Sequence, residues 1–127
     1  MPVVILNGKV YAVSDVEELS GTDAVTLYVC MPPYNKYVLR KLYIYNPDSS
    51  DHVVEVGEYD TVGASWESTK IRVPVSAGQS VALGPDDLPA DFVMTTDPET
   101  AILAWAARLQ AAVAANNVQV KAEFEIA

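Results

Sequence analysis

The chain has 127 residues, half of them hydrophobic, which suits a single domain with a core that needs no disulfide or metal. Its formal net charge is −9 at pH 7, with 8 Lys and Arg against 17 Asp and Glu. Because nucleic acids and anionic membranes are themselves negatively charged, this balance argues against either of them as a partner.

The N-terminal sequence predicts a protein made in the cytoplasm. MPVVILNGKVYAV has no basic region followed by a long apolar stretch, so it is not typical of a signal peptide. The chain also has no run of 18 apolar residues that could span a membrane. The single cysteine, Cys30, lies in the apolar run 25–31, where we expect a small core side chain.

The first segments predict a β-hairpin. Residues 3–6 and 9–13 are separated by Asn7-Gly8, which tolerates the positive φ angles of a type I′ turn. Because residues 3–6 are apolar without exception, we interpret residues 1–20 as an arm that reaches a neighbouring molecule.

The segment after the hairpin predicts a short helical turn, since Ser14 and Glu17 have the spacing of a capping box that would open a turn over 15–19. Period-two alternation then predicts strands over residues 25–31, 37–45, 52–59, 69–75, 80–83 and 118–126. Polar segments with proline or glycine predict turns and loops over residues 46–51, 60–68, 76–79 and 84–91.

The strand 37–45 carries large side chains on both faces. Strict alternation places Val38, Leu42 and Ile44 on one face and Leu39, Tyr43 and Tyr45 on the other. Such a strand is central in its sheet, or a second subunit covers it.

Residues 96–115 fit two structures. Thr96-Asp97-Pro98-Glu99 has the form of a helix start, and apolar residues at helical spacing follow in an alanine-rich run: Ile102, Trp105, Leu109 and Val113. The competing interpretation makes residues 101–106 a strand followed by a loop of small residues.

No group of residues predicts catalysis. The one histidine, His52, follows Asp51, and adjacent residues of a strand point to opposite faces, so we expect His52 to be exposed or at an edge. Asp86, Asp87 and Asp91 would be the oxygen ligands of a calcium site, but their spacing matches no calcium loop, and a solvated acidic loop accounts for them. The sequence therefore predicts no catalytic residue, no metal and no cofactor.

Tyrosines recur on or beside the predicted strands of the sandwich: Tyr28, Tyr37, Tyr43, Tyr45 and Tyr59. Packing on a half-buried sheet accounts for tyrosines of this kind. A protein–protein interface and a sugar-stacking surface are the functional alternatives.

Three stretches of sequence follow a recognisable order. TLYVCMPPYNKYVLRKLYIYNPDSSDHVVEV gives a strand, a proline-bearing link and a long strand that ends in Asn-Pro and a serine-rich turn. IRVPVSAGQSVAL leads through an Ala-Gly turn, and ILAWAA precedes the final NNVQVKAEFEIA. This order, over residues 25–127, resembles that of the small β-sandwich virion accessory proteins of tailed bacteriophages. The resemblance implies a strand at 101–106. The linker 107–116 is longer than in that pattern and has high helix propensity, so we expect room for one short helix near 108–115.

We therefore predict an all-β fold, an antiparallel, jelly-roll-like β-sandwich over residues 21–127 preceded by the hairpin arm 1–20. The resemblance implies a non-enzymatic capsid decoration or cement-like protein that binds capsid or tail proteins and forms a homo-oligomer, with a trimer favoured. The interface candidates are the apolar and aromatic residues Val3, Ile5, Tyr37, Tyr43, Tyr45 and Trp66.

Two other functions stay open on the sequence alone. One is a carbohydrate- or receptor-binding module of a tail or fibre, in which Trp66 and Trp105 would stack on the ligand. The other is a subunit of an extracellular filament, in which a donated strand would cover a sheet edge.

Overall fold

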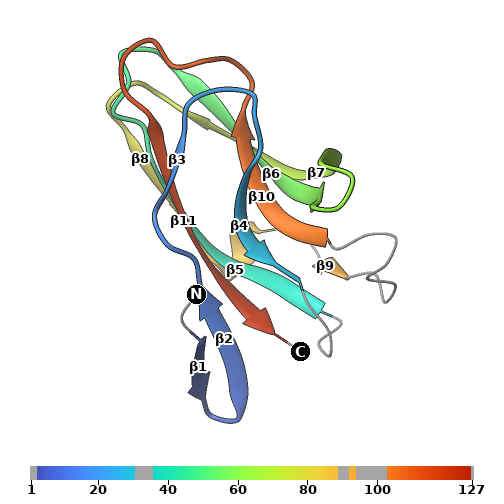
Figure 1. Ribbon diagram of the computed structural model, residues 1–127. Helices are drawn as coiled ribbons and strands as arrows, with labels where there is room; N and C mark the ends of the chain where they lie inside the picture. The colour runs from blue at the N-terminus through green and yellow to red at the C-terminus, as the bar shows by residue number, and fades with distance from the viewer. Residues whose placement is uncertain (1–2, 31–35, 89–91, 94–102, 127) are drawn as a thin grey trace.

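Two antiparallel β-sheets pack face to face in the computed structural model, which describes residues 3–30, 36–88, 92–93 and 103–126 (Figure 1). The first sheet contains β1 (Val3–Leu6), β2 (Lys9–Val13), β3 (Glu17–Leu19), β5 (Lys36–Tyr45), β8 (Ser80–Leu83), β9 (Phe92–Val93) and β11 (Val118–Ile126). The second sheet contains β4 (Val25–Val29), β6 (His52–Asp60), β7 (Ser65–Val75) and β10 (Leu103–Leu109). The predicted all-β antiparallel sandwich is confirmed.

The chain crosses repeatedly from one sheet to the other. Strand β4 lies in the second sheet, β5 in the first, the pair β6 and β7 in the second, β8 in the first, β10 in the second and β11 in the first. Neighbours within a sheet therefore come from distant parts of the sequence, since β11 lies between β2 and β5 and β10 lies between β4 and β6 (Figure 1). This wrapping is the connectivity of a jelly roll.

Alternating apolar residues of both sheets fill the space between them. On β11 the buried residues are Val118, Val120, Ala122, Phe124 and Ile126, the alternation that predicted this strand. Trp105 of β10 packs against Phe124 with ring centroids 5.9 Å apart. Its indole N–H donates to the main-chain oxygen of Tyr37 at 2.8 Å, which ties the second sheet to the first. Cys30 is buried in the same core, as predicted.

The N-terminal hairpin has the predicted turn. Asn7 and Gly8 have φ angles of 51° and 77°, the left-handed pair that a type I′ turn requires. Strand β2 pairs with β11, so the hairpin continues the first sheet, and its turn projects past the end of the sandwich (Figure 1). Strand β3 pairs with β11 as well. Residues before and after the predicted domain boundary at residue 20 therefore belong to one sheet.

The predicted helical turn over 15–19 is wrong. Residues 17–19 form β3, and the Ser14 side chain bonds to strand β11 instead of capping a helix: its oxygen accepts the Ala122 N–H at 2.8 Å. The Ser14 N–H also donates to the Ala122 oxygen at 2.8 Å. Burial of Leu19 against the core then outweighs the local preference for a helical turn.

The short helix near 108–115 is also wrong. Residues 103–109 form β10, and no helix follows in the described residues up to 126. The main-chain donors that a helix would use bind elsewhere, because the N–H groups of Leu109 and Val113 donate to the oxygens of Gly21 and Ser20. The strand predicted over 101–106 is confirmed from residue 103 onward, and residues 101–102 lie outside the described part.

The predicted loop 60–68 is shorter in the structure. Strand β7 begins at Ser65, so Trp66 lies on a strand opposite Tyr59. Strand β7 also contains Pro74, which is compatible with its place at the edge of the second sheet.

Candidate functional site

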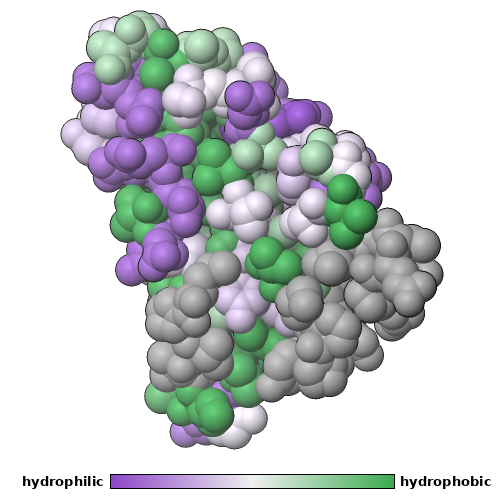
Figure 2. Space-filling view, in the orientation of Figure 1, coloured by the Kyte–Doolittle hydropathy of each residue, from purple (hydrophilic) through white to green (hydrophobic). Residues whose placement is uncertain are grey.

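The outer face of the first sheet and the hairpin beside it form the candidate site. Ile5 and Leu6 on the hairpin are 71% and 57% exposed, and Tyr43 and Tyr45 on β5 are 40% and 44% exposed. The space-filling view shows apolar surface at the hairpin end of the molecule (Figure 2). Large apolar and aromatic groups that remain in water are candidates for contact with another protein.

A β-bulge gives this face its basic side chains. Phe124 of β11 lies opposite Leu39, and Glu123 lies opposite Lys41, so Arg40 is an extra residue on β5 with no partner of its own on β11. The bulge changes which side chains point outward. Arg40 and Lys41, which are adjacent in sequence, both reach the outer face beside Glu123 and Glu125.

Ion pairs link strands β2, β5 and β11 at the bulge. The Arg40 Nε donates to Glu125 Oε2 at 2.8 Å, and Lys9 Nζ lies 3.5 Å from Glu125 Oε1. The hydrogen bond from Arg40 lowers the pKa of Glu125 and outweighs the opposite effect of burial. Lys41 Nζ lies 3.8 Å from a Glu123 oxygen, which is too long for a hydrogen bond.

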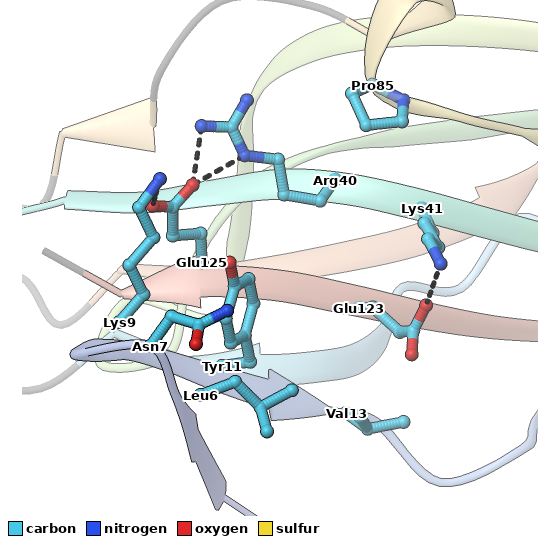
Figure 3. A pocket seen from close by; sticks show the side chains of 10 residues that line it. All are labelled: Leu6, Asn7, Lys9, Tyr11, Val13, Arg40, Lys41, Pro85, Glu123 and Glu125. Atoms are coloured by element: carbon cyan, nitrogen blue, oxygen red, sulfur yellow. Dashed lines mark hydrogen bonds and ion pairs between the residues drawn. The ribbon is translucent and has the colours of Figure 1, made fainter.

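A groove opens between the hairpin and the bulge (Figure 3). Its volume is about 570 Å³, within the size range of sites that hold a ligand or a peptide segment. The lining residues are Leu6, Asn7, Lys9, Tyr11, Val13, Arg40, Lys41, Pro85, Glu123 and Glu125. Leu6, Tyr11 and Val13 line the hairpin side, Pro85 lies across from them, and the ion pairs lie between (Figure 3).

A second, shallower hollow of about 400 Å³ lies farther along the same face. Tyr43 and Tyr45 line it together with Val81 of β8 and Lys121 of β11. This hollow and the groove share strands β5 and β11, so one partner could cover both.

The predicted interface residues do not all lie together. Ile5, Tyr43 and Tyr45 lie on the candidate face or on the hairpin beside it. The backbone of Val3 lies on β1, while its side chain is outside the described part. Trp66 lies on the second sheet, away from the others.

Tyr37 is a correction, because it is buried in the core at 2% exposure. The bulge at Arg40 shifts the alternation, so Tyr37 and Leu39 point inward together with Leu42 and Ile44. Strict alternation placed Leu39 with Tyr43, whereas the adjacent basic residues Arg40 and Lys41 interrupt the period of two at the position of the extra residue.

Neither tryptophan ring is freely exposed for stacking on a sugar. Trp105 is fully buried. Trp66 is half-buried, with the Arg108 guanidinium 4.1 Å from its ring centroid, and its indole N–H donates to Thr69 Oγ1 at 3.0 Å.

Glu55 joins two arginines on the outer face of the second sheet. Its carboxylate accepts from Arg108 Nε and from Arg72 Nε, each at 2.8 Å. Burial raises the pKa of Glu55, but the hydrogen bonds from Arg108, Arg72 and Gln110 lower it by more. The three groups carry one net positive charge, and their hydrogen bonds tie β6, β7 and β10 together on this face.

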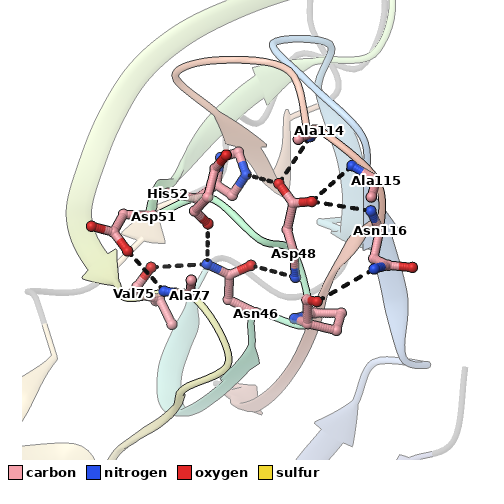
Figure 4. Close-up of polar contacts among 11 residues, drawn as sticks. Asn46, Asp48, Asp51, His52, Val75, Ala77, Ala114, Ala115 and Asn116 are labelled. Atoms are coloured by element: carbon pink, nitrogen blue, oxygen red, sulfur yellow. Dashed lines mark hydrogen bonds and ion pairs between the residues drawn. The ribbon is translucent and has the colours of Figure 1, made fainter.

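His52 is buried, which corrects the prediction that it is exposed or at an edge. Its Nε2 lies 2.7 Å from Asp48 Oδ2 (Figure 4). The same carboxylate accepts the main-chain N–H groups of Ala114, Ala115 and Asn116 at 2.9, 2.8 and 3.1 Å. These bonds fix the loop before β11 against the turn after β5, and no residue pattern indicated that positions 48 and 116 would lie together.

The part of the chain that the structure describes has no group of residues placed to hold a metal ion, and burial disfavours ionisation of its cysteine. No three of its His, Cys, Asp and Glu residues are placed to hold a metal ion. Asp91, one of the three candidate calcium ligands, lies outside the described residues. Burial raises the pKa of the Cys30 thiol, which disfavours the reactive thiolate. Within the described ranges, no helix has the length and apolar character to cross a bilayer.

No known protein family matches the chain, and no curated protein matches it in sequence.

Proposed function

We propose that this protein is a non-enzymatic structural protein of a virus particle. In this role it is a decoration or cement-like accessory protein that self-associates and binds a larger shell of capsid or tail proteins. The order of strands and turns in the sequence supports the viral assignment, and the exposed face of the first sheet supports the assembly role.

The observation that carries the proposal is the exposed apolar hairpin. Ile5 and Leu6 are more than half exposed, and residues 1–14 contain no Asp or Glu in a chain that has 17 of them. Two acidic molecules repel each other over most of their surface, but they can meet at such a hairpin without bringing carboxylates together. Contact there removes two large aliphatic side chains from water.

The free edge of β1 adds a second reason. Among the described residues β1 pairs with β2 alone, so the main-chain N–H and C=O groups of its other edge have no strand partner there. Natural proteins usually protect an apolar edge with charge or proline, because it is a template for pairing with another strand. Residues 3–6 contain neither, which is typical of an edge that a partner covers in the assembled state.

The assembly role is tested by replacing the exposed apolar side chains. The double variant Ile5→Ser, Leu6→Ser should associate at least about tenfold more weakly than the wild type, because burial of each side chain contributes roughly 1.5–3 kcal/mol. Sedimentation velocity over a concentration series measures this change. Val62→Ser is the matched control, since Val62 is 56% exposed on the loop between β6 and β7.

Equal association of the double variant and the control would contradict the role of the hairpin. Circular dichroism of both variants verifies that the fold is retained. The viral assignment is tested separately. Quantitative mass spectrometry of the purified virus particles should find the protein at a fixed copy number per particle. Its absence from the particles would overturn that assignment.

A further inference from the structure

The groove beside the hairpin has a charge opposite to that of the whole molecule. Lys9, Arg40 and Lys41 line it against Glu123 and Glu125, which leaves one net positive charge in a protein of net charge −9. An excess of cations at one hollow of an acidic protein favours an anionic group as its occupant.

The cationic side chains of the groove have hydrogen-bond donors that their present partners do not use. Arg40 uses Nε and Nη2 on a single Glu125 oxygen, which leaves its Nη1 without a partner in the described residues. Lys9 and Lys41 approach their carboxylates at 3.5 and 3.8 Å, which are ion pairs without a short hydrogen bond. A further carboxylate can therefore bind without displacing Glu123 or Glu125.

A source of carboxylates lies at the margin of the same groove. The short 3-10 helix η1 (Pro85–Asp87) begins with Pro85, which lines the groove, and continues with two exposed acidic residues. Asp87 binds the main-chain N–H of Gly84 at 3.1 Å, whereas Asp86 has no hydrogen bond or ion pair in the described part of the structure. The surface thus carries a cationic hollow and an acidic turn side by side.

Adjacent opposite charges on one surface make that surface complementary to itself. A two-fold rotation between the hollow and the turn would place the acidic turn of each copy at the cations of the other copy, so that both contacts form at once. A head-to-tail ring instead needs the two complementary patches on different sides of the molecule.

We infer that the groove binds a second copy of this chain across a two-fold axis, with the acidic turn Pro85–Asp87 of each copy in contact with Lys9, Arg40 and Lys41 of the other. Leu6, at the rim of the groove, is buried in the same contact. This inference rests on the self-association proposed above and specifies its symmetry and its charged groups.

A charge exchange tests the contact. Lys41→Glu and Asp86→Lys should each weaken the dimer about tenfold or more, because each places like charges together. The double variant Lys41→Glu, Asp86→Lys restores opposite charges across the axis and should associate nearly as tightly as the wild type. Asp23→Lys, an exposed change of the same sign in the loop between β3 and β4, should leave the dimer unweakened.

Sedimentation velocity of all five proteins, with thermal unfolding as a check of the fold, distinguishes the outcomes. A dimer that the single changes weaken and the double change restores supports the inference. A trimer, or a dimer that neither change weakens, overturns the two-fold contact while the proposed assembly role stands. A monomer at every concentration overturns both.

Discussion

Gly57 is the residue at which the backbone leaves no room for a side chain. A Cβ atom at this position would lie 2.0 Å from the main-chain oxygen of Ser68 and 2.9 Å from the Cα atom of Thr69. The neighbouring atoms belong to the backbone of β7, so they cannot move aside as a flexible side chain would. The register of β6 and β7 shifts beside Gly57, and the close approach follows from this irregularity.

We predict that Gly57→Ala lowers the free energy of unfolding by roughly 2–3 kcal/mol, because the backbone of β7 must shift to admit the methyl group. Gly84→Ala is the control, since nothing lies within 4 Å of a Cβ there and its φ of −99° suits any residue. The control should change stability by no more than about 0.5 kcal/mol. Urea denaturation measures both, and two similar values would refute the packing described at Gly57.

Asp48 is the residue that connects two distant loops. Hydrogen bonds from the Ala114 N–H and from His52 hold the pKa of its carboxyl far below the usual value, with further bonds from Asn116 and Ala115. A group whose pKa is depressed in the folded state stabilises the fold above its unfolded pKa, which is about 3.9 for Asp. That stabilisation is complete above about pH 5 and is lost as the pH falls through the folded pKa.

We predict that Asp48→Asn lowers the Tm at pH 7, because the neutral amide has one acceptor oxygen and loses the charge-assisted bonds. The difference in Tm from the wild type should narrow steadily between pH 5 and pH 2 and should not narrow above pH 5. Asp23→Asn, at an exposed position, should follow the wild type throughout. A difference that stays constant down to pH 2 would show that the charge of Asp48 does not stabilise the loops.

Residue patterns predicted contacts that are local and missed those that span the chain. Asn7-Gly8 predicted its turn because the requirement for positive φ belongs to the two residues themselves. Nothing in the sequence around Asp48 indicates that its partners are residues 114–116, and the same holds for Arg40 and Glu125. Both pairs form only after the sheets have brought distant segments together.

Among the elements, β5 is the one whose sequence pattern was misleading. Its alternation changes at Arg40, where the bulge adds one residue relative to β11. The extra residue turns Tyr37 inward and brings two adjacent basic side chains to the outer face. The sequence of β5 shows the interrupted alternation at Arg40 and Lys41, but a bulge is a property of two paired strands, so its register against β11 could not be predicted from β5 by itself.

The bulge predicts that β5 tolerates the loss of one particular residue. Deletion of Arg40 leaves Leu39, Lys41 and Leu42 in regular alternation, so the inward residues stay inward. We expect this variant to fold, with a loss of about 1 kcal/mol from the exposed ion pair with Glu125.

Deletion of Tyr43 is the matched comparison. It shifts the alternation between Leu42 and Ile44, which both lie in the core, and should prevent folding. Circular dichroism and thermal unfolding compare the two deletions. An unfolded Arg40 deletion beside a folded Tyr43 deletion would show that the extra residue is placed elsewhere.

The helix-or-strand choice after residue 100 was decided by neighbours of β10. Ala104 and Ala106 are fully buried between β4 and β6, and small side chains there are compatible with a central strand. Their helix propensity amounts to a few tenths of a kcal/mol per residue, which tertiary packing readily exceeds.

At the scale of the whole molecule, alternation in the sequence predicted a sandwich because each strand has one buried face and one exposed face. The order of strands within each sheet depends on long-range pairing, which no single segment of the sequence indicates. The outer face of the first sheet then gathers what separate segments contribute: an apolar hairpin without acid, a cationic groove and two exposed tyrosines.

The proposed function rests on the claim that this protein acts by assembling with copies of itself. The most direct measurement is the molar mass in solution, by light scattering over a wide concentration series at neutral pH. We expect a mass that rises with concentration to a small whole multiple of one chain, and the Ile5→Ser, Leu6→Ser variant should require a higher concentration to reach it. The mass of a single chain at every concentration, in the wild type and the variant alike, would contradict the claim.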